Sequence, residues 1–374
     1  MMNLLAGSFR FLIAGVTSVV AFVLSLPVVL IGAPFWLVST LTGAVHGGMR
    51  RWQTDEVPWD DLIEFVPGIG WKNRGDVKAY VRGNRPFHVT TDPEGWRGEA
   101  SLDDSDIVVF GDSFAFGHGV DDGAFFANRP SAVRVKAIGA NAYNMVQTLL
   151  WMERLKDRLA GKLVVWLVFY GNDLMDNLHP HFDRYRTPFV RSREDGEGWE
   201  IVTEHVSAEP WPFDPRSWYS NEIGEVCSPT FAAERAFSAC DYLIDRARHA
   251  CESARARLAV VGVPEVELLD SRTQRRYRRR APDPELFDPR LPDRRLRAIC
   301  ERASVPFVTL SDVLEVDDHL LNDCHWTPRG HQRVAVVLER LYRTAPALSR
   351  RAERPQGPVA EPAGAASATS EPGA

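Results

Sequence analysis

The sequence predicts an α/β protein, namely a three-layer α/β/α sandwich around a five-stranded parallel sheet, preceded by an apolar helical hairpin. The sheet is predicted because short apolar runs alternate with amphipathic segments, as parallel strands alternate with crossover helices. The hairpin is predicted because a long stretch near the start of the chain carries no charge. The five predicted strands are 107–110, 133–138, 163–169, 258–263 and 306–310.

Composition excludes several classes of protein. The chain has 374 residues, of which 45% are hydrophobic and 25% are charged, as in an ordinary globular protein, so whole-chain disorder and a polytopic membrane protein are excluded. A net charge of -6 gives no global basic field, and we expect no nucleic-acid partner. The five cysteines are widely spaced and contain no CxxC pair, so we expect no disulfide framework and no zinc site. We also expect no other metal and no cofactor.

The first predicted element is a membrane anchor in residues 1–54. Every residue of 11–49 lacks a formal charge, and as one helix this segment would be roughly 58 Å long, against a bilayer core of about 30 Å. Pro27 and Pro34 interrupt it, so we expect two short apolar helices in a hairpin. A single span followed by an interfacial helix, or a buried helix pair, is the alternative. A secretory signal peptide fits less well, because no A-x-A site follows the run.

Basic residues flank the uncharged segment on both sides. Arg10 precedes it, and Arg50 and Arg51 follow it. By the positive-inside rule a hairpin would leave both ends, and the body of the protein, on the cytoplasmic side of the membrane. The periplasmic or extracellular side is the alternative.

Two helices of the domain have clear sequence signals. Ser228 and Pro229 resemble an N-cap and a first helical residue. Thr327 and Pro328 begin a second helix, which we expect to close the sheet. The apolar faces that follow are Phe237, Cys240, Ile244, Ala247 and Cys251 in the first helix, and Val334, Val337, Leu338 and Leu341 in the second.

The remaining segments break the alternation of strands and helices. We expect residues 55–102 to form an N-terminal extension that packs on the main α/β domain, residues 103–346. Residues 174–226 are predicted to form a lid over the carboxyl edge of the sheet, because long loops are usually functional. Residues 347–374 are predicted to be a disordered tail. The lid aromatics are Phe182, Tyr185, Phe189, Trp199, Trp211, Phe213, Trp218 and Tyr219.

Candidate catalytic residues follow the predicted strands. Ser113 comes just after the first strand, where a serine alone is more often a helix N-cap than a nucleophile. Gly139 follows the second strand and Asn172 the third, at the same sheet edge. A glycine lets the backbone approach an oxyanion, and an asparagine amide donates a hydrogen bond. Asp323 and His325 lie two residues apart, so in an extended segment both side chains point to one side.

These residues, in this order, resemble the blocks of the SGNH hydrolases, also called the GDSL esterase/lipase superfamily. The resemblance covers residues 97–341, and the segment 94–99 also looks like bacterial members with an N-terminal membrane anchor. It implies that Ser113 is the nucleophile and His325 the general base. It also implies an oxyanion hole made of the Ser113 and Gly139 N–H groups and the Asn172 amide.

The sequence departs from the family pattern at three places. Phe114 stands where the eponymous leucine is expected, and Gly171 is directly adjacent to Asn172. The usual position of the acid holds Asn322, so we choose Asp323 as the residue that orients the histidine. Some glycan O-acetyltransferase and acetylesterase relatives share this closer spacing.

The reaction that the resemblance implies is acyl transfer through a serine ester. The expected substrate is an acyl or acetyl ester on a lipid or glycan, with the membrane as a partner through residues 11–49. An O-acyltransferase or O-acetyltransferase is the first alternative, and an inactive glycan- or lipid-binding membrane protein is the second. The acyl chain, the alcohol and the oligomeric state are not specified by the sequence.

Other chemical motifs have competing interpretations. His331 is an alternative base, and Cys324 beside His325 an alternative nucleophile. His179 and His181 have metal-like residue types, but no fourth ligand is evident. The arginine-rich run 275–280 is interpreted as a solvated helix face, with contact to anionic lipid headgroups as the alternative.

Overall fold

The computed structural model describes residues 56–344, except 84, 197 and 213–221, and it contains the predicted five-stranded sheet. The strands lie in the order β14-β13-β8-β6-β7, and all neighbours are parallel. Each strand begins and ends within two residues of its predicted bounds. Those bounds are β6 Ile107–Gly111, β7 Val135–Gly139, β8 Leu163–Phe169, β13 Arg257–Val263 and β14 Phe307–Thr309.

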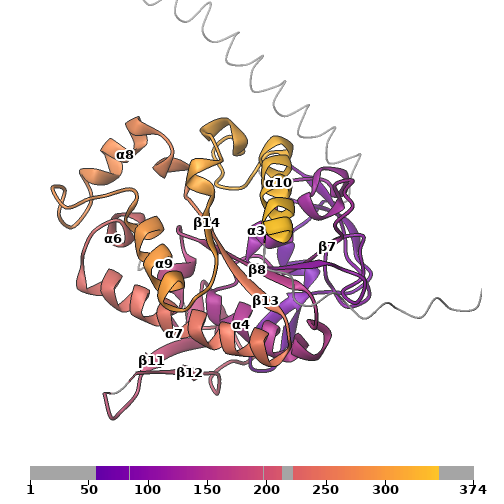
Figure 1. Cartoon of the computed structure of the whole chain (residues 1–374), viewed down its shortest axis with the longest axis horizontal. Coiled ribbons are helices and arrows are strands. Elements are labelled where there is room, and N and C mark those ends of the chain that lie inside the picture. The colour runs from indigo at the N-terminus through magenta and orange to yellow at the C-terminus, as the bar shows by residue number, and fades with distance from the viewer. Residues whose placement is uncertain (1–55, 84, 197, 213–221, 345–374) are drawn as a thin grey trace, which may run out of the picture.

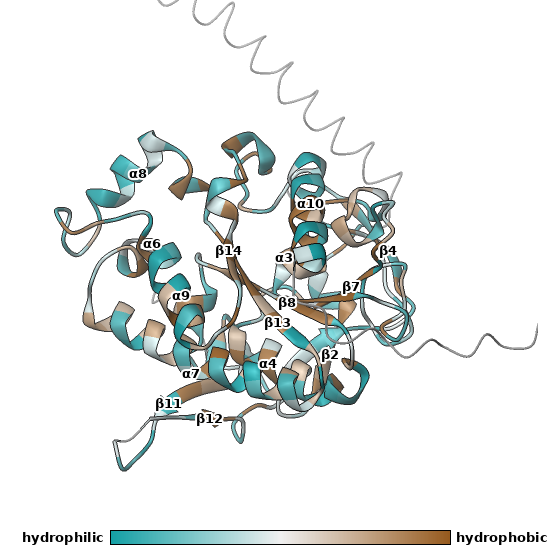
Figure 2. Ribbon diagram, viewed as in Figure 1, coloured by the Kyte–Doolittle hydropathy of each residue, from teal (hydrophilic) through white to brown (hydrophobic). Residues whose placement is uncertain are grey.

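Helices cover both faces of the sheet, which confirms the three layers (Figure 1). Helices α4 (Met145–Leu155), α7 (Phe231–Ser253) and α9 (Leu291–Arg302) pack on one face. Helices α3 (Ser113–Phe116) and α10 (Pro328–Thr344) pack on the other. Alternate apolar residues of the strands enter one core or the other, so the strands are largely apolar on both faces (Figure 2), with Lys136 and Arg257 as charged exceptions.

The start of α7 corrects one sequence prediction. The N-cap is Thr230 and not Ser228, because the Thr230 hydroxyl accepts the Ala233 N–H at 3.1 Å. Ser228 is buried, and its hydroxyl donates to the Gly224 carbonyl. The prediction for α10 is confirmed, since that helix begins at Pro328.

The N-terminal extension forms small sheets that contact the central α/β domain. The Asn73 amide donates to the Gly139 carbonyl at 2.8 Å, and the Trp71 indole N–H donates to the Asn141 carbonyl at 3.1 Å. The segment that contains Trp71 and Asn73 therefore lies against the carboxyl end of β7 and the residues that follow it. Its strands are β1 Glu56–Val57, β4 Lys78–Val81 and β5 Phe87–Thr90 in one sheet, and β2 Ile63–Val66 and β3 Gly70–Asn73 in another.

The segment predicted as a lid contains two small hairpins. One pairs β9 (His181–Phe182) with β10 (Tyr185–Arg186), and the other pairs β11 (Phe189–Ser192) with β12 (Trp199–Val202). The second hairpin packs on α7, where the Trp199 indole donates to Ser238. The lid role stays a prediction. Short helices complete the described chain: α5 Asp173–Asp176, α6 Glu222–Val226 and α8 Ser271–Arg278.

Three predictions fall outside the described residues. They are the anchor in residues 1–54, the tail in residues 347–374, and the lid aromatics Phe213, Trp218 and Tyr219. Among the helices that the structure describes, none is both long and apolar enough to cross a bilayer.

Candidate active site

Ser113 lies at the turn from β6 into α3. The Asp112 carboxylate caps this short helix by accepting the Phe114 N–H at 2.9 Å. Gly117 ends the helix at a φ of 76°, a left-handed conformation that favours glycine. The turn therefore presents Ser113 at the carboxyl edge of the sheet, where open α/β folds bind ligands.

A continuous chain of hydrogen bonds joins three predicted residues. The Ser113 hydroxyl lies 2.7 Å from His325 Nε2, and His325 Nδ1 lies 2.5 Å from the Asp323 carboxylate. The Asp323 carboxylate also accepts the His325 backbone N–H at 3.0 Å. Only 15% of the His325 side chain and 12% of the Asp323 side chain are exposed. The structure thus brings together a hydroxyl, an imidazole and a carboxylate in the order that nucleophilic catalysis needs.

Asn322 and Asp323, the two candidate positions for the acid that orients His325, differ in geometry. Burial opposes ionisation of Asp323, but the hydrogen bond and charge of His325 outweigh it and lower the pKa of Asp323 to about 2. Asn322 is exposed and has a φ of 57°. The left-handed backbone at Asn322 is the turn that places the next residue, Asp323, against the imidazole.

The predicted oxyanion residues lie at the ends of β7 and β8. Gly139 pairs with Gly111, and a Cβ atom built on Gly139 would lie 2.7 Å from the Asp112 carbonyl oxygen. Its backbone therefore lies directly against the turn that carries Ser113. The Asn172 amide donates to the Asp176 carboxylate at 3.0 Å, which fixes the amide and leaves its second N–H for another acceptor.

His118 is a second imidazole in the site, and the sequence interpretation gave it no role. Its ring centroid lies 4.5 Å from that of His325. Its Nδ1 lies 3.1 Å from the Asn141 side-chain amide. Burial, with a further contribution from His325, lowers the pKa of His118 to about 3. His118 is thus neutral at ordinary pH. In the sequence, its position between Gly117 and Gly119 was the one feature that could have indicated a site residue.

A buried arginine holds the loop that carries His118. The Arg97 guanidinium donates to the carbonyl oxygens of Gly117 and Val120, both at 2.6 Å. It also forms an ion pair with Asp122 at 2.9 Å. Because Arg97 is 1% exposed, these bonds are shielded from water and fix the loop beside the triad.

Two more carboxyl groups are buried at the same edge. Burial raises the pKa of Asp112 to about 6. Burial and the neighbouring Asp112 raise the pKa of Asp173 well above its ordinary value. Asp173 accepts the Phe169 N–H at 2.9 Å and so fixes the end of β8.

The site does not form an open metal centre. Within the described residues, His118, Asp323 and His325 are the one group whose ligand atoms lie within 4.8 Å of one another. Both ring nitrogens of His325 are already within hydrogen-bonding distance of Ser113 and Asp323. A metal would have to displace one of these partners.

The alternative base and nucleophile are less well placed. His331 is 1% exposed and stacks on Phe126, with ring centroids 5.6 Å apart. Cys324 Sγ lies 3.8 Å from His325 Nδ1, the nitrogen that Asp323 already occupies, and burial raises the pKa of the thiol. The role of each therefore remains packing beside the triad.

The histidine pair His179 and His181 and the arginine-rich run 275–280 show no sign of a ligand site in their contacts. His181 Nδ1 lies 3.0 Å from the Asp183 carbonyl oxygen, and His179 lies near Asp176. The arginine-rich run belongs mostly to α8, where all of its arginines are exposed, as expected of a solvated helix face.

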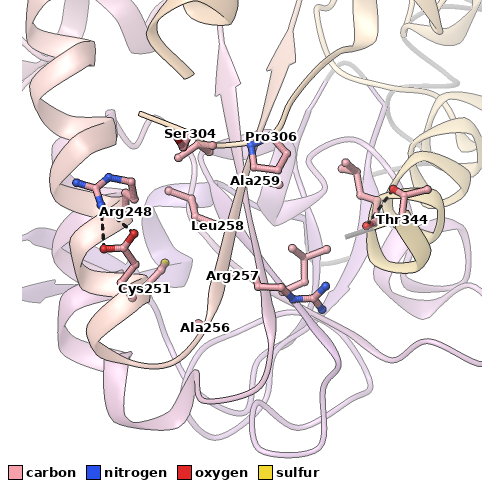
Figure 3. A pocket seen from close by; sticks show the side chains of 13 residues that line it. Arg248, Cys251, Ala256, Arg257, Leu258, Ala259, Ser304, Pro306 and Thr344 are labelled. Atoms are coloured by element: carbon pink, nitrogen blue, oxygen red, sulfur yellow. Dashed lines mark hydrogen bonds and ion pairs between the residues drawn. The ribbon is translucent and has the colours of Figure 1, made fainter. Parts of the chain in front are cut away.

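A separate cavity of about 400 Å³ lies at the opposite edge of the sheet. It is lined by the start of β13, including Leu258, by the end of α7 and by the end of α10 (Figure 3). Its lining is largely apolar, and none of the candidate catalytic residues contributes to it.

Comparisons with known proteins name no family for the chain. The sequence matches no family model, and a search of curated proteins finds no match. Among solved structures, a member of the lipolytic protein G-D-S-L family from Veillonella parvula is similar at 10% identity, with a TM-score of 0.37. That match covers 64% of this chain and 98% of the other.

Two further solved structures have similar values. A GDSL-like lipase from Bacteroides thetaiotaomicron matches at 11% identity and a TM-score of 0.33, over 66% of this chain and 92% of its own. The inhibitor-bound aryl esterase of M. smegmatis matches at 11% identity and a TM-score of 0.33, over 64% of this chain and 98% of its own.

Proposed function

We propose that the protein is a serine esterase of the SGNH type, which hydrolyses an ester through a Ser113–His325–Asp323 triad. The observation that supports this proposal is the hydrogen-bond chain from the serine hydroxyl through the imidazole to the carboxylate. The three groups lie at the carboxyl edge of a parallel sheet, where a substrate has access to them.

The first half of the reaction forms an acyl-enzyme. His325 Nε2 removes the Ser113 proton as the oxygen attacks the ester carbonyl, and Asp323 holds the imidazole in the tautomer that this transfer needs. The N–H groups of Ser113 and Gly139, with the Asn172 amide, stabilise the oxyanion. Each such donor contributes about 3 kcal/mol in the transition state.

The second half releases the acyl group. The imidazolium gives its proton to the leaving alcohol, and water then attacks the acyl-enzyme with His325 as base again. An acceptor alcohol in place of water would make the protein an O-acyltransferase or O-acetyltransferase. The close Asp323–His325 spacing, which resembles that of some glycan O-acetyltransferases, favours this as the second candidate.

We infer a membrane setting for the same chemistry. The uncharged segment 11–49 would anchor the protein, and by the positive-inside rule the flanking arginines favour the cytoplasmic side for the catalytic domain. Protease accessibility in sealed and opened vesicles tests the side. Digestion of the catalytic domain from the outside of intact cells would contradict the cytoplasmic orientation.

A panel of p-nitrophenyl esters from acetyl to long chain, run with and without an acceptor alcohol, tests the activity. An esterase releases p-nitrophenol at a rate that depends on chain length and not on the acceptor. A rate that requires the acceptor indicates a transferase. No release with any ester, at any acceptor concentration, would contradict both and leave the inactive binding protein.

A further inference from the structure

The loop that carries His325 does not fix the direction of the imidazole by itself. Asp323, which bonds to His325 Nδ1, lies two residues earlier in the same bend, so the two side chains move together. The Leu320 N–H donates to the His325 carbonyl at 2.8 Å and closes this loop on itself. Contacts from outside residues 320–325 must therefore direct the imidazole toward Ser113.

Two aromatic rings from one short segment provide such contacts. The ring centroid of Phe114 lies 5.0 Å from that of His325, with 35° between the ring planes. The ring centroid of His118 lies 4.5 Å from that of His325, with 39° between the planes. Both rings belong to residues 113–118, which also carry Ser113. The nucleophile and the rings that pack on its base therefore come from the same segment.

The residue after His118 supports the start of the loop that carries the base. A Cβ atom on Gly119 would collide with the Leu320 side chain, so Leu320 packs directly on the Gly119 backbone. Gly119 has a φ of 83°, a left-handed conformation that glycine adopts without strain. His118 and Gly119 thus contact the two ends of the loop 320–325.

The His118 ring is itself held from two further directions. Its Nδ1 lies 3.1 Å from the side-chain nitrogen of Asn141, in the segment after β7. The ring of Phe87 in β5 meets it edge-on, with centroids 4.9 Å apart, and Phe87 is 1% exposed. The His118 backbone N–H donates to the Ser113 carbonyl at 3.0 Å. His118 therefore connects the N-terminal extension and the end of β7 to the catalytic base.

A neutral ring suits this place beside the base. Burial lowers the pKa of His118 to about 3, and the nearby His325 lowers it further toward that value. His325 becomes an imidazolium during acylation, and a second positive charge at this distance would oppose that step. The hydrogen bonds of the triad run from Ser113 to His325 to Asp323 and do not include the His118 ring.

We propose that His118 is a positioning residue, whose ring packs on the His325 imidazole and holds it toward Ser113. His118 takes no proton in the reaction and acts through His325. The inference rests on the proposed esterase function and adds one residue to it. It also gives the N-terminal extension a part in catalysis, because Phe87 of the extension packs on the His118 ring.

Two variants of the full-length protein separate the ring of His118 from its hydrogen bond. His118→Phe keeps a ring against His325 but loses the partner of Asn141, whereas His118→Gln keeps a polar partner and loses the ring. The assay uses the p-nitrophenyl ester that the native protein hydrolyses fastest. In His118→Gln, kcat should fall about 10- to 100-fold with KM changed less than about threefold, because a misdirected base slows the chemical step and not binding. In His118→Phe, kcat should stay within about threefold of the native value.

A matched control makes the same change elsewhere. His249→Gln lies on the exposed surface of α7 and should alter neither kcat nor KM. Circular dichroism gives the folded fraction of each variant, to which kcat is referred. An unchanged kcat in His118→Gln, a loss in KM alone, or a loss in His118→Phe as large as that in His118→Gln would overturn the positioning role. A native protein that hydrolyses no ester would instead overturn the proposed function.

Discussion

The two edges of the central sheet differ in chemistry although they are built from the same five strands. At the carboxyl edge lie Ser113, His325 and Asp323, with the buried carboxyl groups of Asp112 and Asp173. At the amino edge lies a cavity of about 400 Å³ with a largely apolar lining. The strands themselves are mostly apolar, with Lys136, Arg257 and Thr309 as exceptions, so most of the difference comes from the segments that follow or precede them.

The comparison shows where this fold has room for polar groups. At the carboxyl edge, glycines such as Gly139 allow backbone segments to approach within contact distance, and the short helices α3 and α5 begin there. Each buried carboxyl group there accepts a backbone N–H or meets an imidazole. At the amino edge, Leu163 and Leu258 belong to the two apolar cores of the sheet. We therefore expect mutations at the two edges to affect different measurements.

The largest effect is expected at the nucleophile. Ser113→Ala removes the attacking oxygen, so ester hydrolysis should fall by at least about 10⁴-fold, while the melting temperature stays close to that of the native protein. The assay is p-nitrophenyl ester hydrolysis, with circular dichroism to follow unfolding. A Ser113→Ala protein that keeps its activity would show that the carboxyl edge is not the reaction centre.

The second-largest effect on kcat is expected at Asp323 and not at the adjacent Asn322. Asp323→Asn leaves the fold but removes the charge that orients His325, so kcat should fall about 10²- to 10⁴-fold. Asn322→Gly keeps the left-handed backbone at 57° and should change kcat less than threefold. A larger loss in Asn322→Gly than in Asp323→Asn would reassign the orienting residue.

A mutation at the amino edge of the sheet should lower the free energy of unfolding and leave kcat unchanged. Leu258 is 7% exposed, and Leu258→Ala should lower the free energy of unfolding by about 2–4 kcal/mol because it enlarges an apolar cavity. The folded fraction should keep its kcat. Urea unfolding followed alongside activity checks both statements. A loss of kcat with unchanged stability would mean that the two edges are coupled.

The smallest effect depends on pH. The pKa of Asp112 is raised to about 6 in the folded protein from an ordinary value of 3.8, so the folded state resists ionisation of this carboxyl. Its cost to stability is absent below about pH 4 and is complete above pH 6, where it is on the order of 1–3 kcal/mol.

Asp112→Asn removes this cost and keeps a side-chain cap for α3. The variant should therefore be more stable than the native protein at pH 8, and the difference should vanish as the pH falls to 4. Thermal unfolding across this pH range is the measurement. A constant difference at all pH values would show that Asp112 is not the titrating group.

The sheet and the triad were predictable because both depend on local patterns. A strand buried on both faces is a continuous apolar run, so 163–169 could be read directly. The pairing of Asp323 with His325 was expected from an extended segment, but residues 323–325 form a bend in which the Asp323 carboxylate also accepts the His325 backbone N–H. The role of Ser113 was expected from the resemblance to the SGNH hydrolases, since its place just after a buried strand alone favours a helix N-cap.

The remaining features depend on contacts between distant segments. His118 meets His325 across more than two hundred residues, and no local pattern contains that contact. A cavity near Glu267 and His319 likewise forms only when the loop after β13 meets the loop before α10. Thr230 and Ser228 are both good N-cap residues, so the sequence alone does not decide between them. In the structure Thr230 caps α7, because the Ser228 hydroxyl instead donates to the Gly224 carbonyl.

Labelling with a fluorophosphonate tests the central claim most directly. The reagent reacts with a serine that a neighbouring base activates and not with an ordinary one. We predict that the native protein is labelled and that peptide mass spectrometry places the adduct on Ser113. Labelling should be lost in His325→Ala. An unlabelled native protein, or an adduct on a different residue, would contradict the account.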